Sequence, residues 1–231
     1  MALMEYELDE HVAVLTMNSG ENRFNFDFYD AILPVFDEIE NNTEATVLVV
    51  RSGHEKIWSN GIDLDWLGPA AQEGGPELRQ RFMRGMNELF RRILTYPMIT
   101  IAAINGHAFA GGAFMACCFD FRFMRSDRGW FCFPEVDLKM PFRPSFIPLV
   151  KKAVPMYMFE EMKYTGKRVT GQECEEHHIV MKACHNDDLM NEVMAFAKGV
   201  NKDRGILKIM KQMMNKEILD LQIAEDEGKS N

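Results

Sequence analysis

The sequence predicts an α/β fold whose core is a largely parallel sheet. Continuous apolar runs at residues 45–51 (ATVLVVR) and 99–104 (ITIAAI) are typical of strands covered on both faces. Residues 77–96 lie between these runs and carry apolar side chains at helical spacing, as do residues 27–40 before the first run. This alternation of helix and buried strand favours parallel strands joined by helical crossovers.

Composition limits the size, partners and compartment of the protein. The 231 residues are 47% apolar and 26% charged, which fits one globular domain or one domain with a helical appendage. A net charge of -9 and a pI near 5.2 argue against a broad nucleic-acid-binding face, although a local group of basic residues can still hold a small anion. The N-terminus has no basic region before an apolar core, and no apolar run reaches about 18 residues, so we expect neither secretion nor a membrane span.

The cysteines and histidines do not form a recognisable metal or disulfide pattern. The five cysteines are odd in number and lack CxxC spacing, which favours reduced, mostly buried thiols in the cytosol. His107 and the pair His177-His178 lack the spacing of a metal site, so no metal is predicted. The 18 methionines are expected to fill gaps between helices.

In the N-terminal half, short elements alternate with turns. Residues 4–16 alternate polar and apolar side chains around Asp9 and Glu10, which predicts a hairpin. Pro34 either kinks the helix at residues 27–40 or marks a displaced start. Residues 57–64 form a short strand or loop, and the glycine-rich residues 68–76 (GPAAQEGGP) are expected to be a mobile surface connection.

The C-terminal half is predicted to be mainly helical. Two short helices are expected at residues 145–154 and 155–164. Thr170 and Glu173 match a capping box that opens another helix. Two more helices are expected between residue 187 and about residue 222, parted near residues 203–205, and residues 225–231 are expected to fray.

Glycine interrupts two otherwise apolar segments, at Gly61-Ile62 and at Gly111-Gly112. Glycine lets another group approach the main chain closely, and a helix that starts at Gly111 directs free amides and a partial positive charge into the space before it. Two such amides can form an oxyanion hole, although glycine turns alone are weak support because they occur in most folds.

Glu135 follows the aromatic stretch WFCFP. If this strand leads inward, the carboxyl lies against aromatic surface, and desolvation raises its pKa and makes it a better proton acceptor near neutral pH. The alternative is an ion pair with an arginine such as Arg122 or Arg143, which the residue pattern alone favours.

Several separated motifs resemble the crotonase superfamily, the enoyl-CoA hydratase and isomerase group. They are IWSNGIDL, GHAFAGGAFMACCFDFRFM, PEVDL and TGKRVTGQEC, in the family's order over nearly the whole chain. The resemblance implies a ClpP/crotonase-like spiral of ββα units at residues 1–165. It also implies a C-terminal helical region at residues 166–231 that builds a homotrimer, or a hexamer made of two trimers. Acyl-CoA would be the ligand, with coenzyme A part of the substrate and no separate cofactor.

The resemblance assigns roles position by position. The amides of Ile62 and Gly111 correspond to those that bind the thioester oxygen in this family, and Glu135 corresponds to one of two hydratase carboxylates. The other hydratase glutamate lies three residues after the glycine, where this chain has Phe114. Syn hydration needs two carboxylates that hold and activate a water, and phenylalanine does neither. The chain is therefore most like the delta-3,delta-2-enoyl-CoA isomerases, which use a single glutamate.

The resemblance also suggests residues for the remainder of the ligand. Arg23 and Phe24 would lie beside the nucleotide, and Ser59, Gly61 and Ile62 would line the pantetheine path. Candidates for the acyl pocket, each of which is alternatively a core residue, are Trp66, Met83, Phe114, Trp130, Phe133 and Phe142. Arg143 departs from the family pattern and either pairs with Glu135 or lies outside the pocket.

The expected activity is a shift of the double bond of an acyl-CoA from the 3 to the 2 position in fatty acid β-oxidation. Two alternatives remain: another crotonase-type reaction, such as hydrolysis, decarboxylation or hydration, and a non-catalytic acyl-CoA binding module. The C-terminus GKSN does not match a peroxisomal SKL signal, so the expected compartment is the cytoplasm. Acyl chain length and cis or trans preference cannot be read from the sequence.

Overall fold

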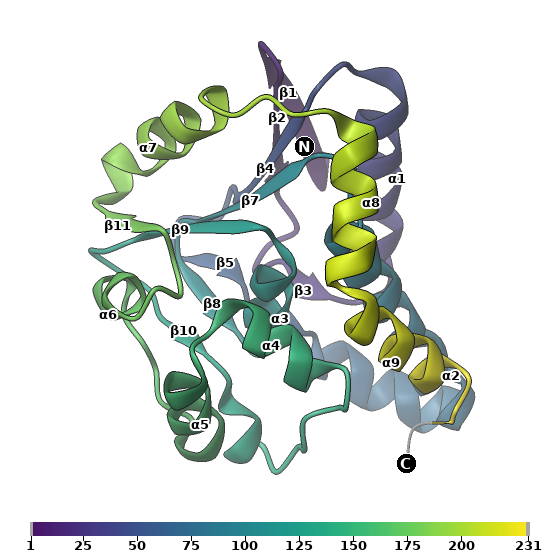
Figure 1. Ribbon diagram of the computed structural model, residues 1–231. Helices are drawn as coiled ribbons and strands as arrows, with labels where there is room; N and C mark the ends of the chain where they lie inside the picture. Colours follow the sequence, from purple (N-terminus) through teal and green to yellow (C-terminus); the bar gives the residue numbers. More distant parts are fainter. Residues whose placement is uncertain (1, 230–231) are drawn as a thin grey trace.

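The computed structural model describes residues 2–229 and contains one large and two small sheets (Figure 1). The large sheet has the order β1-β2-β4-β7-β9-β11, in which β1 is antiparallel to β2 and the other pairs are parallel. The small sheets have the orders β10-β8-β5 and β3-β6. The strands are β1 (Met4–Asp9), β2 (Val12–Met17), β3 (Arg23–Phe24), β4 (Val47–Ser52), β5 (Ile57–Ser59), β6 (Gly61–Ile62), β7 (Ile99–Ile104), β8 (His107–Phe109), β9 (Phe121–Arg125), β10 (Phe131–Cys132) and β11 (Lys182–Cys184).

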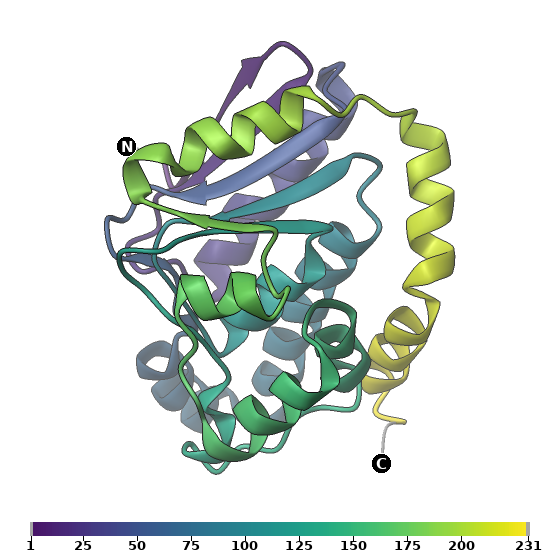
Figure 2. The same ribbon diagram turned by 60° about the vertical axis from the view of Figure 1, so that its left-hand side comes forward.

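Helices cover both faces of the large sheet and one end of the molecule. Figure 2 shows α7 lying across the strands. The helices are α1 (Phe26–Asn42), α2 (Leu64–Leu94), α3 (Gly111–Cys118), α4 (Phe146–Ala153), α5 (Met156–Thr165), α6 (Gly171–Glu176), α7 (Asn186–Lys198), α8 (Arg204–Met214) and α9 (Lys216–Asp226), with a short 3-10 helix, η1 (Pro134–Val136).

The chain forms a spiral in which each turn adds a strand to the large sheet, a strand to a small sheet and then a helix. β4 is followed by β5, β6 and α2; β7 is followed by β8 and α3; and β9 is followed by β10 and η1. The predicted α/β class and its spiral of ββα units are confirmed. The segment after residue 165 is not wholly helical, because β11 pairs with β9 in the large sheet.

The strands of the large sheet bury alternate side chains on opposite faces. In β4, Leu48 and Val50 face the main core, which contains the buried faces of α1, α2 and α3. Val47 and Val49 face the second core, to which α7 contributes Leu189 and Val193. The β-branched residues of this run suit a strand that packs on both sides, as the sequence indicated.

The glycine-rich residues 68–76 are helical, so the prediction that they form a connection between elements was wrong. They belong to α2, which breaks only at Gly75 (φ 60, ψ -155). The Asp63 carboxylate caps α2 by accepting the Trp66 amide at 3.2 Å. Pro76 directly follows the break, at a position where its missing N–H costs nothing. Pro34 lies inside α1 and does not mark its start.

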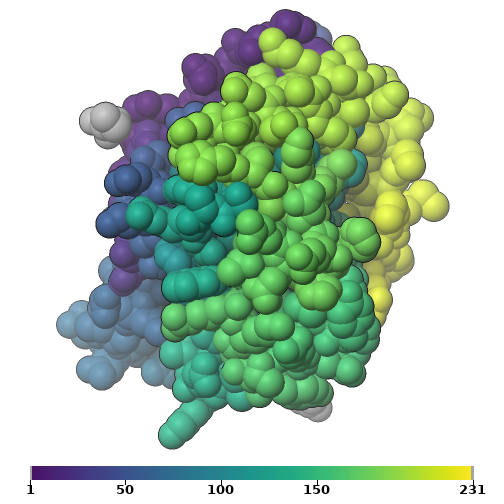
Figure 3. Space-filling model, turned by 90° about the vertical axis from the view of Figure 1, so that its left-hand side faces the viewer, coloured from purple at the N-terminus to yellow at the C-terminus, as the bar shows by residue number. Residues whose placement is uncertain are grey.

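The C-terminal segment contains three helices, where two were predicted. Asn215 separates α8 from α9, and Glu225 is buried in α9, so residues 225–226 are not frayed; residues 230–231 lie outside the described part. Figure 3 shows α7 and the end of the molecule formed by these helices. The capping box at Thr170 and Glu173 is confirmed.

The outer face of α8 is apolar and exposed. Its side chains are Ile206, Ile209, Met210, Met213 and Met214, so these methionines do not fill gaps between helices. The face supports the expected association of copies through the C-terminal helices, and the oligomeric state stays a prediction. No helix within residues 2–229 is long and apolar enough to cross a membrane.

Two turns of the spiral touch through their main chains at Gly61 and Gly111. A Cβ placed on Gly61 would lie 2.4 Å from the Gly111 nitrogen and 2.8 Å from its Cα, and Gly61 has a φ of +71°. Both the contact and the backbone angle therefore exclude a side chain at this position. The contact brings β6 against the start of α3.

We expect Gly61→Ala to lower the free energy of unfolding by at least about 2 kcal/mol, because left-handed backbone strain adds to overpacking against Gly111. Gly20→Ala is a matched control, since Gly20 also has a positive φ (+54°) but has no atom within 4 Å of its would-be Cβ. It is expected to lose only about 1 kcal/mol. Denaturant unfolding measures both, and equal losses would mean that the Gly61–Gly111 contact is not tight.

Candidate active site

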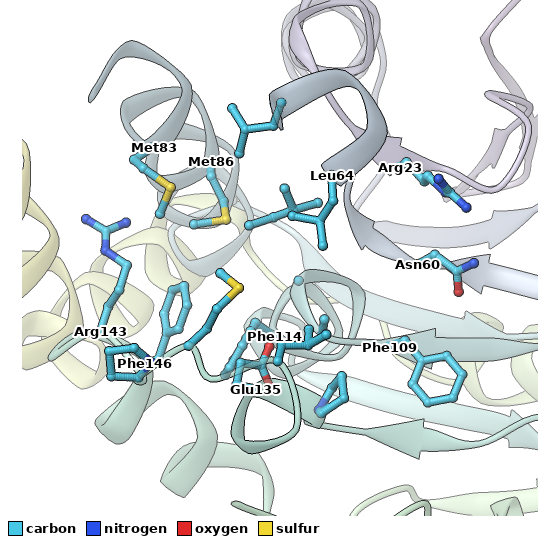
Figure 4. A pocket seen from close by; sticks show the side chains of 18 of the residues that line it. Arg23, Asn60, Leu64, Met83, Met86, Phe109, Phe114, Glu135, Arg143 and Phe146 are labelled. Atoms are coloured by element: carbon cyan, nitrogen blue, oxygen red, sulfur yellow. The ribbon is translucent and has the colours of Figure 1, made fainter. Parts of the chain in front are cut away.

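A cavity of about 520 Å³ lies between α2, the start of α3 and the segment that follows β10. In Figure 4, Arg23 and Asn60 lie at one end, Met83, Met86 and Arg143 at the other, and Glu135 and Phe114 between them. The lining is mostly apolar, and its residues are Arg23, Asn60, Ile62, Leu64, Asp65, Leu67, Met83, Met86, Phe109, Ala110, Gly111, Phe114, Pro134, Glu135, Leu138, Met140, Pro141, Arg143 and Phe146.

Ile62 and Gly111 lie at equivalent points of consecutive spiral turns, where a small-sheet strand passes into a helix. Gly111 is the first residue of α3, so its amide has no acceptor within the helix, and the helix dipole adds partial positive charge there. The preceding Ala110 has φ 47 and ψ -122, a strained conformation for a residue with a Cβ. Such strain at the wall of a cavity indicates that the backbone is held in place by its surroundings.

Glu135 occupies the same point of the next turn, in η1 directly after β10. The residue is 7% exposed, and among residues 2–229 its Oε2 atom has no hydrogen-bond partner. Burial raises the pKa of Glu135 to about 7, and a hydrogen bond from its own backbone amide opposes this rise only partly. The carboxyl can therefore exchange a proton near neutral pH.

The arginines that could have paired with Glu135 are engaged elsewhere. Arg143 Nη2 lies 2.8 Å from Glu225 Oε2, and Arg122 donates to the carbonyl oxygens of Ile179 and Phe119 at 2.9 and 2.8 Å. The alternative in which Glu135 is a structural ion-pair partner is therefore wrong. Arg143 nevertheless lines the cavity, so its predicted place outside the pocket is wrong as well.

Phe114 is fixed by other aromatic rings one turn into α3. Its ring stacks on Phe146 with centroids 4.2 Å apart, and it also contacts Phe133 at 4.9 Å and Phe142 at 5.1 Å. This packing keeps the ring buried in the wall of the cavity. The wall beside Glu135 is consequently apolar.

The other cavity carboxylate, Asp65, lies at the open end. It is exposed and pairs with Arg23 at 2.7 Å. Arg23 also pairs with Glu21 at 2.6 Å and approaches Asp63 at 3.7 Å. A phosphate at this end would therefore compete with carboxylates for Arg23.

Six of the predicted site residues line one cavity: Arg23, Ile62, Met83, Gly111, Phe114 and Glu135. The remaining residues predicted for coenzyme A do not line it. Phe24 is fully buried against Phe28 and Phe90, so we withdraw its predicted contact with the nucleotide. Ser59 is buried too; its hydroxyl donates to the Asn22 carbonyl oxygen at 2.7 Å and accepts the Gly61 amide at 3.2 Å, which fixes the turn before Ile62.

Four predicted acyl-pocket residues lie outside the cavity. Trp66 packs on the other side of α2 between Phe26 and Phe82, and Phe133 and Phe142 lie behind Phe114. Trp130 lies on the surface beside His107. Aromatic residues also occur in protein cores and on surfaces. Their position near the recognised motifs was therefore not enough to predict which of them line the cavity.

Several lining residues were missed by sequence reasoning. Met86 lies one helical turn after Met83, and that spacing on α2 could have identified it. Phe109 and Asn60 belong to the motifs already recognised. Arg143 is contributed by the irregular segment after Glu135, whose path carried no periodic signal, and Phe146 is the first residue of α4. Within residues 2–229, no group of three or more His, Cys, Asp or Glu side chains is arranged to hold a metal ion.

A family model described as enoyl-CoA hydratase/isomerase matches residues 7–229. The chain belongs to this family. The predicted membership of the crotonase group is thereby confirmed, and the chain is an enzyme of a family that acts on acyl-CoA substrates.

Individual relatives carry isomerase and hydratase names. The chain is 32% identical to Enoyl-CoA delta isomerase 3 of Arabidopsis thaliana over 187 residues, which cover 80% of this chain and 78% of the relative. It is 30% identical over 190 residues to Enoyl-CoA delta isomerase 2, peroxisomal, of the same plant, covering 81% and 79%. It is 28% identical over 208 residues to a putative enoyl-CoA hydratase of Thermus thermophilus, covering 88% and 80%.

Solved structures of the family have the same fold. A family protein from Pseudomonas syringae superposes with a TM-score of 0.86 at 25% identity, covering 98% of this chain and 96% of that one. A probable enoyl-CoA hydratase from Mycobacterium tuberculosis gives a TM-score of 0.85 at 21% identity, covering 98% and 94%.

The raised pKa of Glu135 makes protein stability depend on pH. The carboxyl titrates near 4.5 when unfolded and near 7 when folded, so the folded state loses stability as pH rises through this window. We expect Glu135→Gln to be more stable than wild type by on the order of 3 kcal/mol above pH 7, and about equal to it at pH 4.5.

Denaturant unfolding at the two pH values measures this difference. Asp137→Asn, which changes an exposed carboxyl two residues away, is the control and is expected to differ from wild type equally at both values. If Glu135→Gln and wild type showed parallel pH dependence, the carboxyl would not be desolvated in the folded protein.

Proposed function

We propose that this enzyme is a delta-3,delta-2-enoyl-CoA isomerase. The observation that carries the proposal is the buried carboxyl of Glu135, which has an oxygen without a hydrogen-bond partner among residues 2–229 and lines the same apolar cavity as Gly111. Moving a double bond along an acyl thioester requires one group that accepts and returns a proton, and donors that stabilise the enolate oxygen. The cavity supplies both kinds of group.

The proposed reaction has two proton transfers. The Glu135 carboxylate removes a proton from C2 of the 3-enoyl thioester, and the electron pair of that C–H bond spreads over a dienolate. The amides of Ile62 and Gly111 donate hydrogen bonds to its oxygen. The Glu135 carboxyl then gives the proton to C4, so that the double bond lies between C2 and C3 and the carboxylate is regenerated. A pKa of about 7 suits a group that acts as base and acid in turn.

Phe114 favours isomerisation over hydration. Addition of water needs a second group that holds the nucleophilic water, and the ring of Phe114 occupies the wall of the cavity with three other aromatic rings around it. An apolar wall also keeps water away from the dienolate. The isomerase names of two relatives that are at least 30% identical support the same choice.

The activity test supplies a 3-enoyl-CoA and follows the conjugated 2-enoyl thioester by absorbance. Wild type is expected to convert it, and Glu135→Gln to reduce kcat by about 10²–10⁴-fold because the only positioned base is lost. Asp137→Asn serves as the control carboxylate variant and is expected to retain activity.

Two results would contradict the proposal. Equal rates for wild type and Glu135→Gln would remove Glu135 from the mechanism. Hydration of a 2-enoyl-CoA by wild type at a rate that rivals isomerisation would show that Phe114 does not prevent addition of water.

The dependence of the rate on pH gives an independent check. Because Glu135 must be ionised to accept the C2 proton, kcat/KM is expected to rise with pH and level off above an apparent pKa of about 7. The profile is measured with 3-enoyl-CoA at concentrations well below KM, where the rate reports on the free enzyme. A midpoint near 4.5, the ordinary value for a glutamate, would mean that the cavity is wet around the carboxyl.

A further inference from the structure

The far end of the cavity is polar, although the walls that lead to it are apolar. Arg143 lines this end together with Met83 and Met86 of α2 and Phe146 of α4 (Figure 4). The guanidinium group extends toward Met83 in this view. An acyl chain that runs past Glu135 away from Arg23 would therefore end near a cation.

Arg143 is held by a buried network that docks α9. Its Nη2 lies 2.8 Å from Glu225 Oε2, and its Nη1 donates to Asn87 Oδ1 at 3.2 Å. Glu225 also accepts the Ser145 amide and hydroxyl, each at 2.9 Å. These contacts hold the guanidinium in place at this end of the cavity.

The network leaves part of the guanidinium without a hydrogen-bond partner, although its Cζ atom lies over the Phe146 ring, 5.9 Å from the ring centroid. A guanidinium carries five N–H donors; Arg143 donates one to Asn87 and forms an ion pair with Glu225 through Nη2. Among residues 2–229, its Nε atom makes no hydrogen bond, and the hydrogen bond to Asn87 is made through Nη1. The side chain is 22% exposed, and burial lowers the pKa of Arg143.

An acyl chain that ends in a methyl group and one that ends in an oxygen would bind differently beside the Arg143 guanidinium. The methyl end of an alkyl chain would displace water from the free N–H donors and give no acceptor in return. A terminal oxygen would accept a charge-assisted hydrogen bond and replace that water. On this basis, and resting on the proposed isomerase function, we propose that the pocket selects acyl-CoA substrates whose acyl chain carries a neutral oxygen acceptor, a hydroxyl or carbonyl, at its far end.

The charges around Arg143 favour a neutral acceptor over a carboxylate. The charge of Arg143 is already balanced by Glu225. The next residue, Asp226, pairs at 2.7 Å with Arg91, which lies in α2. A terminal carboxylate would add a negative charge beside two carboxylates. A hydroxyl would use the free N–H donors without that repulsion.

The experiment measures dissociation constants of saturated acyl-CoA thioesters by calorimetry. Pairs of equal chain length, with and without a terminal hydroxyl, are compared over a series of lengths, together with the matching terminal carboxylates. At the length that reaches Arg143, wild type is expected to bind the hydroxyl compound about 10- to 100-fold more tightly than the alkyl compound. The carboxylate compound is expected to bind no more tightly than the hydroxyl compound.

Variants show whether Arg143 causes the preference. Arg143→Met keeps an unbranched side chain and removes the donors, and is expected to reduce the preference to less than about 2-fold. The double variant Arg143→Met/Glu225→Met also removes the buried carboxylate that the single change leaves unpaired, and is used if the single variant does not fold. Arg91→Met is the matched control, because it breaks another arginine contact to α9 outside the cavity and is expected to keep the preference.

The binding constants of wild type and of the Arg143 variant either support or overturn the proposed preference. Equal or tighter binding of the alkyl compound at every length would overturn the proposal, as would an undiminished preference in the Arg143 variant. Because the ligands are saturated, the result does not depend on turnover. Loss of isomerase activity toward every 3-enoyl-CoA would refute the proposed function and leave this binding measurement interpretable.

Discussion

The close contact between the main chains at Gly61 and Gly111 sets the geometry of the site. It holds the start of β6 against the first residue of α3, so that the segments bearing Ile62 and Gly111 are positioned together by backbone and not by side chains. The strained Ala110 lies at the same junction. Because neither segment can shift without moving a strand of a small sheet, the donors for an enolate oxygen would need little reorganisation during reaction.

The spiral explains how residues distant in sequence reach one cavity. Ile62 is the last residue of β6, and Gly111 and Glu135 come shortly after β8 and β10; these strands belong to three consecutive turns. Repetition of the same unit therefore brings three strand ends to the same cavity. The third differs from the others in that it follows an aromatic stretch, which desolvates Glu135 and raises its pKa.

Sequence reasoning identified the fold, the glycine turns and Glu135 because each depends on local pattern or on a recognisable motif. It misjudged residues 68–76, where Asp63 and Pro76 favour helix despite three glycines. It also misassigned Trp130 and Phe24, because burial and direction are set by tertiary packing that an aromatic residue does not reveal. The partner of Arg143 could not be predicted, since Glu225 comes close only after α9 has folded back.

The pair formed by Arg143 and Glu225 ties the cavity to the last helix, so that mutations at the cavity wall and in this helix affect one another. Loss of Glu225 alone would leave the Arg143 cation at the cavity without its counter-charge, and loss of Arg143 alone would leave a buried carboxylate unpaired. Either single step is costly, so the two positions are expected to show strong epistasis. A mutation of Arg143 at the cavity wall would therefore require a second substitution, in a helix that does not itself line the cavity.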